Sequence, residues 1–417
     1  MNTTSGSSIE VWIDNVQTPQ NLYEPTIPPN LSWPSDDKEN SRAAAKKRRI
    51  MQSDHDQTPR PLKRLRDLND TSRFPPSSPT TSASSEAVSD AFEAESHQSG
   101  RLSPVKQIQL LEDFEDQPVI FCNFDDDVDG AEPDDVTSMR RAIQRFADGI
   151  GILGYDNVDE AVFALPPLER MRFRYPWASD LDQRCSIGSM PSIAQVLDIV
   201  KTAREHDRGS GVSEDDWNSE VQHPLLKLAC STCKHSETLL VLNVKTARIE
   251  PASLSRSTLP GRVVDYVVAL KPDSILDQAW HRLRPLPSMS IKSWNHTTRA
   301  RRNPIAIHVE TKSPMKSWTD GKPQIAIWTD ALLKRLALIS GNASGSWPAL
   351  PLLIAQGHDW HLLIVSKNDQ KMIIWEQIDI GSTRSCFDAM KVLAALHWLM
   401  DWAERVWRPW FLSLVVQ

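Results

Sequence analysis

The chain has 417 residues and a formal net charge of −7, which taken as a whole argues against a nucleic-acid-binding protein. Its hydrophobic runs are shorter than a membrane-spanning helix, and its first residues lack the apolar region of a signal peptide. We therefore expect neither a membrane protein nor a secreted one, and the odd number of cysteines, five, is typical of a reducing compartment.

Residues 1–115 are rich in Ser, Thr, Pro, Asp and Gln and contain few apolar runs, so we expect a disordered leader. Two basic clusters in it are spaced like a bipartite nuclear import signal: Lys46, Lys47, Arg48 and Arg49, then Lys63, Arg64 and Arg66. They predict an import receptor as a partner and a nuclear location, with a cytoplasmic location as the alternative. A solvated charge run or a nonspecific nucleic-acid tether would explain the same residues.

The charge is distributed unevenly between the two halves of the chain. Residues 201–417 carry 27 Lys and Arg against 21 Asp and Glu, so the excess of acids lies in the first 200 residues. A mildly basic module behind an acidic leader is compatible with contacts to phosphate groups. The distribution thus reverses the impression given by the net charge.

We expect one folded domain over residues 116–417, with a helical part at 116–210 and a core at 211–417. Apolar periodicity predicts helices over residues 139–152 and 192–205, and a helical pattern also covers residues 104–121. The segment 213–223 opens with a capping serine and acids in its first turn, so it predicts a helix that Pro224 kinks or divides.

Apolar runs rich in β-branched residues follow and predict the central sheet of an α/β protein. The first three strands are expected at 239–244, 262–270 and 304–312, followed by a helix after Pro323. Further strands are expected at 350–355, 361–365 and 372–375, and a long closing helix at 386–406. The core therefore has the order α-β-β-β-α-β, with a mixed sheet flanked by helices.

Two of these strands carry charged residues that predict a metal-dependent site. Asp265 interrupts the second run, and Glu310, Thr311 and Lys312 end the third. Because side chains alternate along a strand, Glu310 and Lys312 point to the same face and Thr311 to the other. Two carboxylates can bind Mg²⁺ without a full protein cage, and a nearby lysine can orient water or counter phosphate charge. A simple salt bridge between Glu310 and Lys312 is the alternative.

The pattern of Asp265 and then Glu310-Thr311-Lys312 resembles the signature of the PD-(D/E)xK nuclease superfamily, without the proline before the first acid. Three further motifs, together with Glu310-Thr311-Lys312, make the last three hundred or so residues similar to the fungal PD-(D/E)xK nuclease-like family: Trp217-Asn218, Asn295-His296-Thr297 and the segment from Gln324 to Trp328. The resemblance implies a restriction-endonuclease-like core. It also implies a glutamine on the helix after the second signature strand, here Gln324, and a glutamate on the helix before the sheet, here Glu220. A plain surface acid on that helix is the alternative for Glu220.

The resemblance further implies a phosphodiesterase that acts on nucleic acid, DNA rather than RNA, with Mg²⁺ or Mn²⁺ as its cofactor. Asp265, Glu310 and the Thr311 carbonyl would bind the metal, with help from Glu220. Lys312 would position the attacking water, and Gln324 would orient either Lys312 or that water. Many such nucleases dimerise, so a homodimer is expected, and the alternative function is a non-catalytic module of the same fold that binds nucleic acid or a protein.

A basic segment before the third predicted strand is a candidate for contacts with substrate phosphate. Its members are His296, Arg299, Arg301 and Arg302. A loop histidine that only holds its own backbone is the alternative for His296.

Overall fold

The computed structural model describes residues 102–124, 132–154, 160–209, 211–256, 259, 263–341, 346–368 and 370–416. The two basic clusters of the predicted leader lie outside the described residues. Seven strands form one sheet in the order β1-β7-β6-β5-β4-β3-β2. They are β1 Val119–Asn123, β2 Leu239–Asn243, β3 Tyr266–Leu270, β4 Ile305–Lys312, β5 Leu350–Gln356, β6 Asp359–Lys367 and β7 Met372–Ser382.

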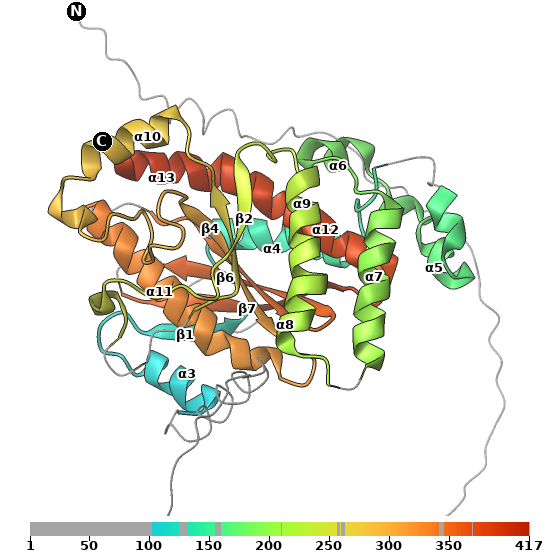
Figure 1. Ribbon diagram of the computed structural model, residues 1–417, viewed down its shortest axis with the longest axis horizontal. Helices are drawn as coiled ribbons and strands as arrows, with labels where there is room; N and C mark the ends of the chain where they lie inside the picture. Colours follow the sequence, from blue (N-terminus) through green and yellow to red (C-terminus); the bar gives the residue numbers. More distant parts are fainter. Residues whose placement is uncertain are drawn as a thin grey trace, which may run out of the picture. The chain divides into compact units, whose positions relative to one another are not determined.

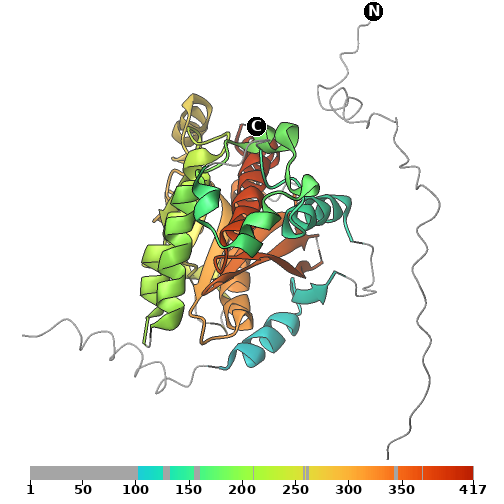
Figure 2. The same ribbon diagram turned by 90° about the vertical axis from the view of Figure 1, so that its right-hand side faces the viewer.

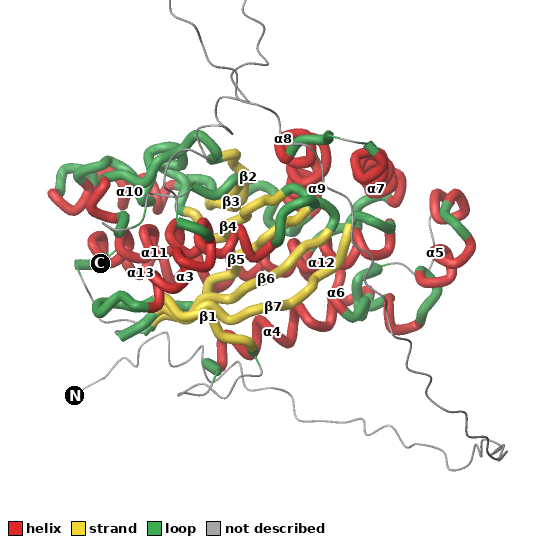
Figure 3. The backbone as a smooth tube through the Cα atoms, turned by 90° about the horizontal axis from the view of Figure 1, so that it is seen from below, coloured by secondary structure: helices red, strands yellow, loops and turns green. Residues whose placement is uncertain are grey.

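The sheet is mixed, as the sequence predicts, and helices flank it (Figure 3). β1 pairs in parallel with β7, and β4 pairs in parallel with β5, whereas the other neighbours are antiparallel. Every residue of β4 is buried, because the strand lies between two others and helices cover the sheet. A strand covered on both faces reads as a continuous apolar run, which is why the charged residues at its end stand out.

Six helices build the layers around the sheet. α11 (Lys322–Ile339) contacts β4, and α3 (Pro104–Glu112) packs on α11. α12 (Cys386–Trp402) and α4 (Asp134–Ala147) contact β7. α7 (Ile193–Arg208) and α9 (His223–Thr232) pack on α12 and lie side by side (Figure 1). No helix in the described part of the chain is both long and apolar enough to cross a bilayer.

The remaining helical segments connect these layers. They are η1 Glu160–Ala164, α5 Pro167–Arg172, η2 Pro176–Ala178, α6 Leu181–Ile187, α8 Glu214–Trp217, η3 Asn218–Gln222, η4 Ala252–Leu254, α10 Ser274–Leu283, η5 Pro287–Met289, η6 Trp318–Gly321, η7 Ala403–Trp407 and α13 Arg408–Val415.

Two predicted helices are divided in the same way, by a π-turn that precedes a proline. The π-turn η3 separates α8 from α9, whose second residue is Pro224, and η7 separates α12 from α13, whose second residue is Pro409. Proline has no N–H to donate and its ring crowds the preceding turn, and a locally widened turn accommodates both. The division predicted at Pro224 is confirmed, and the closing helix predicted at 386–406 ends at Trp402 for the same reason.

The N-terminal part of the described chain differs from the prediction. The helical pattern expected at 104–121 ends at Glu112, and Val119–Asn123 instead adds the strand β1 beside β7, as Figure 2 shows in cyan. α3 also lies within the range 1–115 that was expected to be a disordered leader. The helix predicted at 139–152 runs from Asp134 to Ala147, because Gly149 and Gly151 follow with positive φ angles of 82° and 65°.

A buried ion pair holds this N-terminal segment against the core. Arg256 follows η4 and donates hydrogen bonds of 2.9 and 2.8 Å to the carboxylate of Asp330 on α11. Its guanidinium also donates to the carbonyl oxygens of Asp116 and Gln117, at 3.4 and 2.6 Å, and lies over the Phe114 ring. Both side chains of the pair are almost fully buried, so Arg256 ties the link between α3 and β1 to α11.

We predict that Arg256→Ala destabilises the protein by about 3 kcal/mol, because it leaves Asp330 buried beside Lys334 alone and frees two carbonyl oxygens. Arg302→Ala is the matched control, since the Arg302–Asp277 pair is nearly half exposed and should cost less than about 1 kcal/mol. Urea unfolding of both variants measures the difference. Equal losses would show that the pair does not anchor this segment.

Candidate active site

The site is built around Glu310 and Lys312 at the end of β4. Both side chains are buried, with exposed fractions of 0% for Glu310 and 5% for Lys312. The Lys312 ammonium forms an ion pair with Glu310 Oε1 and donates a hydrogen bond of 3.0 Å to the Thr311 carbonyl oxygen. The second oxygen of Glu310, Oε2, is buried and has no hydrogen-bond partner among the described residues. This corner of the sheet, formed by Glu310 and Lys312, therefore holds a carboxylate with one oxygen that accepts no hydrogen bond from the described residues.

Asp265 lies beside this pair, one residue before β3. Its Oδ2 atom accepts hydrogen bonds from the Thr311 backbone N–H at 2.8 Å and from Thr311 Oγ1 at 2.7 Å. Its Oδ1 atom is 3.9 Å from the Lys245 ammonium. The antiparallel pairing of β3 with β4 thus brings the two predicted acids to one end of the sheet.

Burial controls the protonation of these groups. Burial raises the pKa of Glu310 well above its usual range, the Lys312 ammonium opposes the shift, and the charges of Asp265 and Glu214 add to it. Burial also raises the pKa of Asp265, against the opposing effects of Lys312 and Thr311. Lys312 behaves differently: burial disfavours its charge, but the carboxylates of Glu310 and Glu214 outweigh burial and raise its pKa. The corner thus keeps its ammonium charged while its carboxylates are costly to ionise.

Glu214, in the first turn of α8, is the site residue that sequence reasoning missed. Its Oε2 atom accepts hydrogen bonds from the Ser313 N–H at 3.1 Å and from the Lys316 ammonium at 3.2 Å. Its Oε1 atom is 4.0 Å from the Lys312 ammonium. The available signal was the acidic first turn after Ser213, where α8 opens with a capping box.

Glu220, the predicted helix glutamate, is directed away from the pair of Glu310 and Lys312. Its side chain is more than half exposed and lies 3.1 Å from His206 on α7. It stands in the π-turn η3, six residues after Glu214, and the turn directs it to the neighbouring helix rather than to the sheet.

The start of α11 packs against β4 and β5 beside the site. A Cβ atom at Gly321 would lie 3.2 Å from Glu310 Cγ and 3.4 Å from Ile354, so glycine lets the helix approach the carboxylate. Gln324 donates a hydrogen bond of 3.4 Å to the Val263 carbonyl oxygen, two residues before Asp265. In this structure Gln324 therefore positions the chain that carries Asp265, and it makes no hydrogen bond to Lys312.

Three of the four residues predicted to contact substrate phosphate do not fit that role. His296 is fully buried and packs edge-on against Trp328, with ring centroids 4.0 Å apart, so it cannot reach a substrate. Arg301 and Arg302 lie over Trp280 on α10, which follows β3 and so lies at the other end of that strand from Asp265. Arg299 is exposed and donates to the carbonyl oxygen of Asn243 at the end of β2, so it alone stays near the site.

The donor set of the corner fits a hard divalent cation. Among the described residues no three His, Cys, Asp or Glu side chains have the spacing of a protein cage for a metal ion. Mg²⁺ is commonly held by one or two carboxylates together with substrate phosphates and water. Asp265 and the unpartnered oxygen of Glu310 supply two carboxylates, whereas the Thr311 carbonyl, predicted as a third ligand, accepts a hydrogen bond from Lys312.

Comparison with known proteins agrees with this geometry. A family model described as PD-(D/E)XK nuclease superfamily matches residues 163–408, more than half of the chain, and includes Glu214, Asp265, Glu310 and Lys312. No curated protein and no solved structure matches the chain.

We predict that Glu214→Gln lowers the free energy of unfolding more than Glu220→Gln does, although both residues belong to one helical segment. Glu214→Gln should destabilise the protein by about 1–2 kcal/mol, because it weakens charged hydrogen bonds that hold the end of β4. Glu220→Gln removes an exposed contact and should cost no more than about 0.5 kcal/mol. Urea unfolding measures both, and a larger loss in Glu220→Gln would contradict the placement of Glu214.

Proposed function

Because the chain belongs to the PD-(D/E)XK nuclease superfamily, we propose that it hydrolyses phosphodiester bonds of nucleic acid, DNA rather than RNA, with Mg²⁺ or Mn²⁺. The observation that carries the proposal is the buried pair of Glu310 and Lys312, with a free carboxylate oxygen, beside Asp265. An unpartnered buried carboxylate oxygen is costly in a purely structural ion pair, and a ligand at this position would use it.

The two carboxylates bind the cation in this proposal. Asp265 would use Oδ1, since both of its hydrogen bonds from Thr311 end on Oδ2, and Glu310 would use Oε2. A divalent cation, when bound, polarises a phosphate oxygen and lowers the pKa of water. Thr311 fixes the orientation of Asp265 through two short hydrogen bonds, so the carboxylate is already aligned before substrate arrives.

Lys312 supplies the positive charge on the reacting side. It shares a strand face with Glu310 and keeps its proton, so its ammonium can donate hydrogen bonds to a phosphate oxygen or to the attacking water. Glu214 holds the chain after Lys312 through Ser313, and Gln324 holds the chain before Asp265 through Val263. Both residues therefore position the catalytic groups from outside.

One observation also favours the non-catalytic alternative. The direct contact between Lys312 and Glu310 is the arrangement that a structural ion pair would have. A nuclease-fold module that only binds nucleic acid or a protein would keep such a pair for stability. The two functions differ in what happens when either charge is removed.

We predict that Glu310→Ala abolishes cleavage while nucleic-acid affinity changes little or rises, because a carboxylate that faces phosphate is lost. Lys312→Ala should retain metal binding but lower kcat roughly 100-fold or more, since it removes charge stabilisation in the transition state. Lys201→Ala, a surface lysine of α7, is the control and should be unaffected.

The measurement is a cleavage panel of single- and double-stranded DNA and RNA with Mg²⁺, Mn²⁺ or EDTA, together with binding assays. Cleavage of DNA by the wild type that depends on metal and on Glu310 supports the proposal. If the wild type cleaves no substrate with any divalent ion while both variants bind normally, the protein is the non-catalytic module.

A second prediction concerns pH. Glu310 must lose its proton to bind a cation, and its pKa lies above the usual 4.5, so protons compete with metal at a higher pH than for an ordinary glutamate. Mn²⁺ affinity should therefore fall as the pH is lowered towards and below the raised pKa, by up to about tenfold per pH unit. Calorimetric titration between pH 8 and pH 5 measures the slope. Glu310→Gln should bind weakly with a shallower slope, and a wild-type affinity that is constant down to pH 5 would contradict the assignment.

A further inference from the structure

An exposed apolar and arginine-rich segment lies between Phe163 and Leu181, before the α-helix that leads into the core. Six of its large apolar side chains are exposed, up to 81% for Leu168: Phe163, Leu168, Met171, Tyr175, Trp177 and Leu181. They come from η1, α5, η2 and α6, except Tyr175, which is the residue before η2. Water-exposed apolar groups gathered in this way are typical of a binding surface.

Two of these side chains form a rigid aromatic pair. The rings of Tyr175 and Trp177 stack with centroids 4.6 Å apart and an interplanar angle of 21°. Pro176 stands between them and begins η2, so the backbone that carries both rings is restricted. Trp177 is 53% exposed even though one of its faces is covered by Tyr175. The pair therefore offers a flat, pre-organised surface on which another planar group can stack.

Arginines alternate with the aromatic residues in this segment. Arg174 is exposed, and its side chain makes no hydrogen bond or ion pair with the described part of the chain. Arg170 lies over the Phe163 ring, with 5.9 Å between its guanidinium carbon and the ring centroid. Of the two acids in the segment, Glu169 is turned inward, where it accepts hydrogen bonds from the backbone N–H groups of Cys386 and Phe387. Asp180 accepts a hydrogen bond from the Gln183 N–H at 3.0 Å and lies 3.9 Å from Arg145. Around Tyr175 and Trp177 the outer surface thus combines aromatic rings with the Arg174 guanidinium, which suits bases and phosphates.

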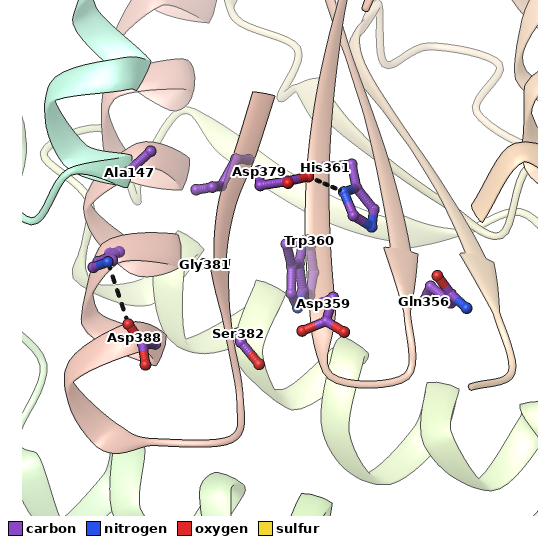
Figure 4. Close-up of a pocket in the computed structure, with 11 residues that line it drawn as sticks. Ala147, Gln356, Asp359, Trp360, His361, Asp379, Gly381, Ser382 and Asp388 are labelled. Atoms are coloured by element: carbon purple, nitrogen blue, oxygen red, sulfur yellow. Dashed lines mark hydrogen bonds and ion pairs between the residues drawn. The ribbon is translucent and has the colours of Figure 1, made fainter. Parts of the chain in front are cut away.

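A pocket near α5 is lined by residues of β5, β6, β7 and α12. Arg172 of α5 donates hydrogen bonds of 3.0 and 2.7 Å to Asp388, and Asp388 lines a cavity of about 350 Å³. Gln356 lines the other end of the cavity (Figure 4) and is the partner of Lys312 in the pairing of β5 with β4.

Two of the three aspartates of this pocket pair with arginine, which weakens their repulsion of a polyanion. Arg384 pairs with Asp359 at 3.0 Å, His361 contacts Asp379 at 2.6 Å, and Arg172 neutralises Asp388. Near α5 the pocket therefore presents aspartates whose charges are partly offset by arginine.

We propose that Tyr175, Trp177 and Arg174 bind a single-stranded segment of the substrate, with one base stacked on the ring pair and Arg174 on a neighbouring phosphate. The segment must be single-stranded, because the faces of bases in a duplex are covered by their neighbours. This inference rests on the proposed function, since it names the form of nucleic acid that the site takes.

The test is fluorescence anisotropy of the full chain with a labelled single-stranded DNA oligonucleotide in EDTA, so that no cleavage occurs. The double variant Tyr175→Ala/Trp177→Ala should raise Kd roughly 10-fold or more, and Trp177→Phe alone should stay close to the wild type because it keeps a ring. Arg174→Ala should raise Kd several-fold and reduce its salt dependence. Leu168→Ser and Arg301→Ala are the controls for apolar area and for charge, and circular dichroism verifies the fold of each variant.

Three results would overturn the inference: single strands do not bind, they bind the double variant as tightly as the wild type, or Leu168→Ser weakens binding as much as loss of the rings. A wild-type dimer that the double variant converts to monomer in sedimentation would instead make the segment an interface between copies. If single strands bind through Trp177 but are not cleaved in Mg²⁺, the nuclease proposal fails and this inference stands. If the protein cleaves with metal but the double variant binds single strands as the wild type does, only this inference fails.

Discussion

The burial of two opposite charges at the end of β4 is the constraint around which the rest of the site is arranged. Glu310 and Lys312 lie in a fully buried strand, where an isolated charge would be prohibitively costly. Each compensates for the other, yet in the described part of the chain one oxygen of Glu310 has no hydrogen-bond partner, and the pKa of its carboxyl is raised. Without a ligand the carboxylate of Glu310 is incompletely compensated and therefore costly to ionise. A bound cation with a phosphate would stabilise its charged form.

The neighbouring elements serve this corner in different ways. β3 brings Asp265 to it through hydrogen bonds from Thr311, and α8 brings Glu214, which holds the chain after Lys312. Gly321 allows the start of α11 to approach Glu310 closely. Residues from four separate parts of the chain thus depend on the register between β3 and β4. A slip of one residue would turn Glu310 and Lys312 to the opposite face.

The segments outside the family match extend the fold and hold it together. α3 and β1 precede residue 163, where the match begins, yet β1 adds an edge to the sheet and Arg256 binds the link between them. Within the match, the segment of α5 and η2 is tied to α12 by Arg172 and Asp388 while its aromatic rings stay exposed. Arg256 and Arg172 thus stabilise the fold, whereas Arg174 remains available to a partner.

The sequence alone determined the α/β class and the strands from Leu239 onward, and it predicted that Asp265, Glu310 and Lys312 meet at one end of the sheet. These follow from local chemistry: β-branched apolar runs make buried strands, and a charge inside such a run is rare enough to be informative. Tertiary structure decided what depends on packing between distant segments. β1 is only five residues long and became a strand through its pairing with β7, a partner that no local pattern reveals. The choice of Glu214 over Glu220 depended on a π-turn, and the exclusion of His296 depended on its burial against Trp328, since neither helix phase nor depth can be read from residue type.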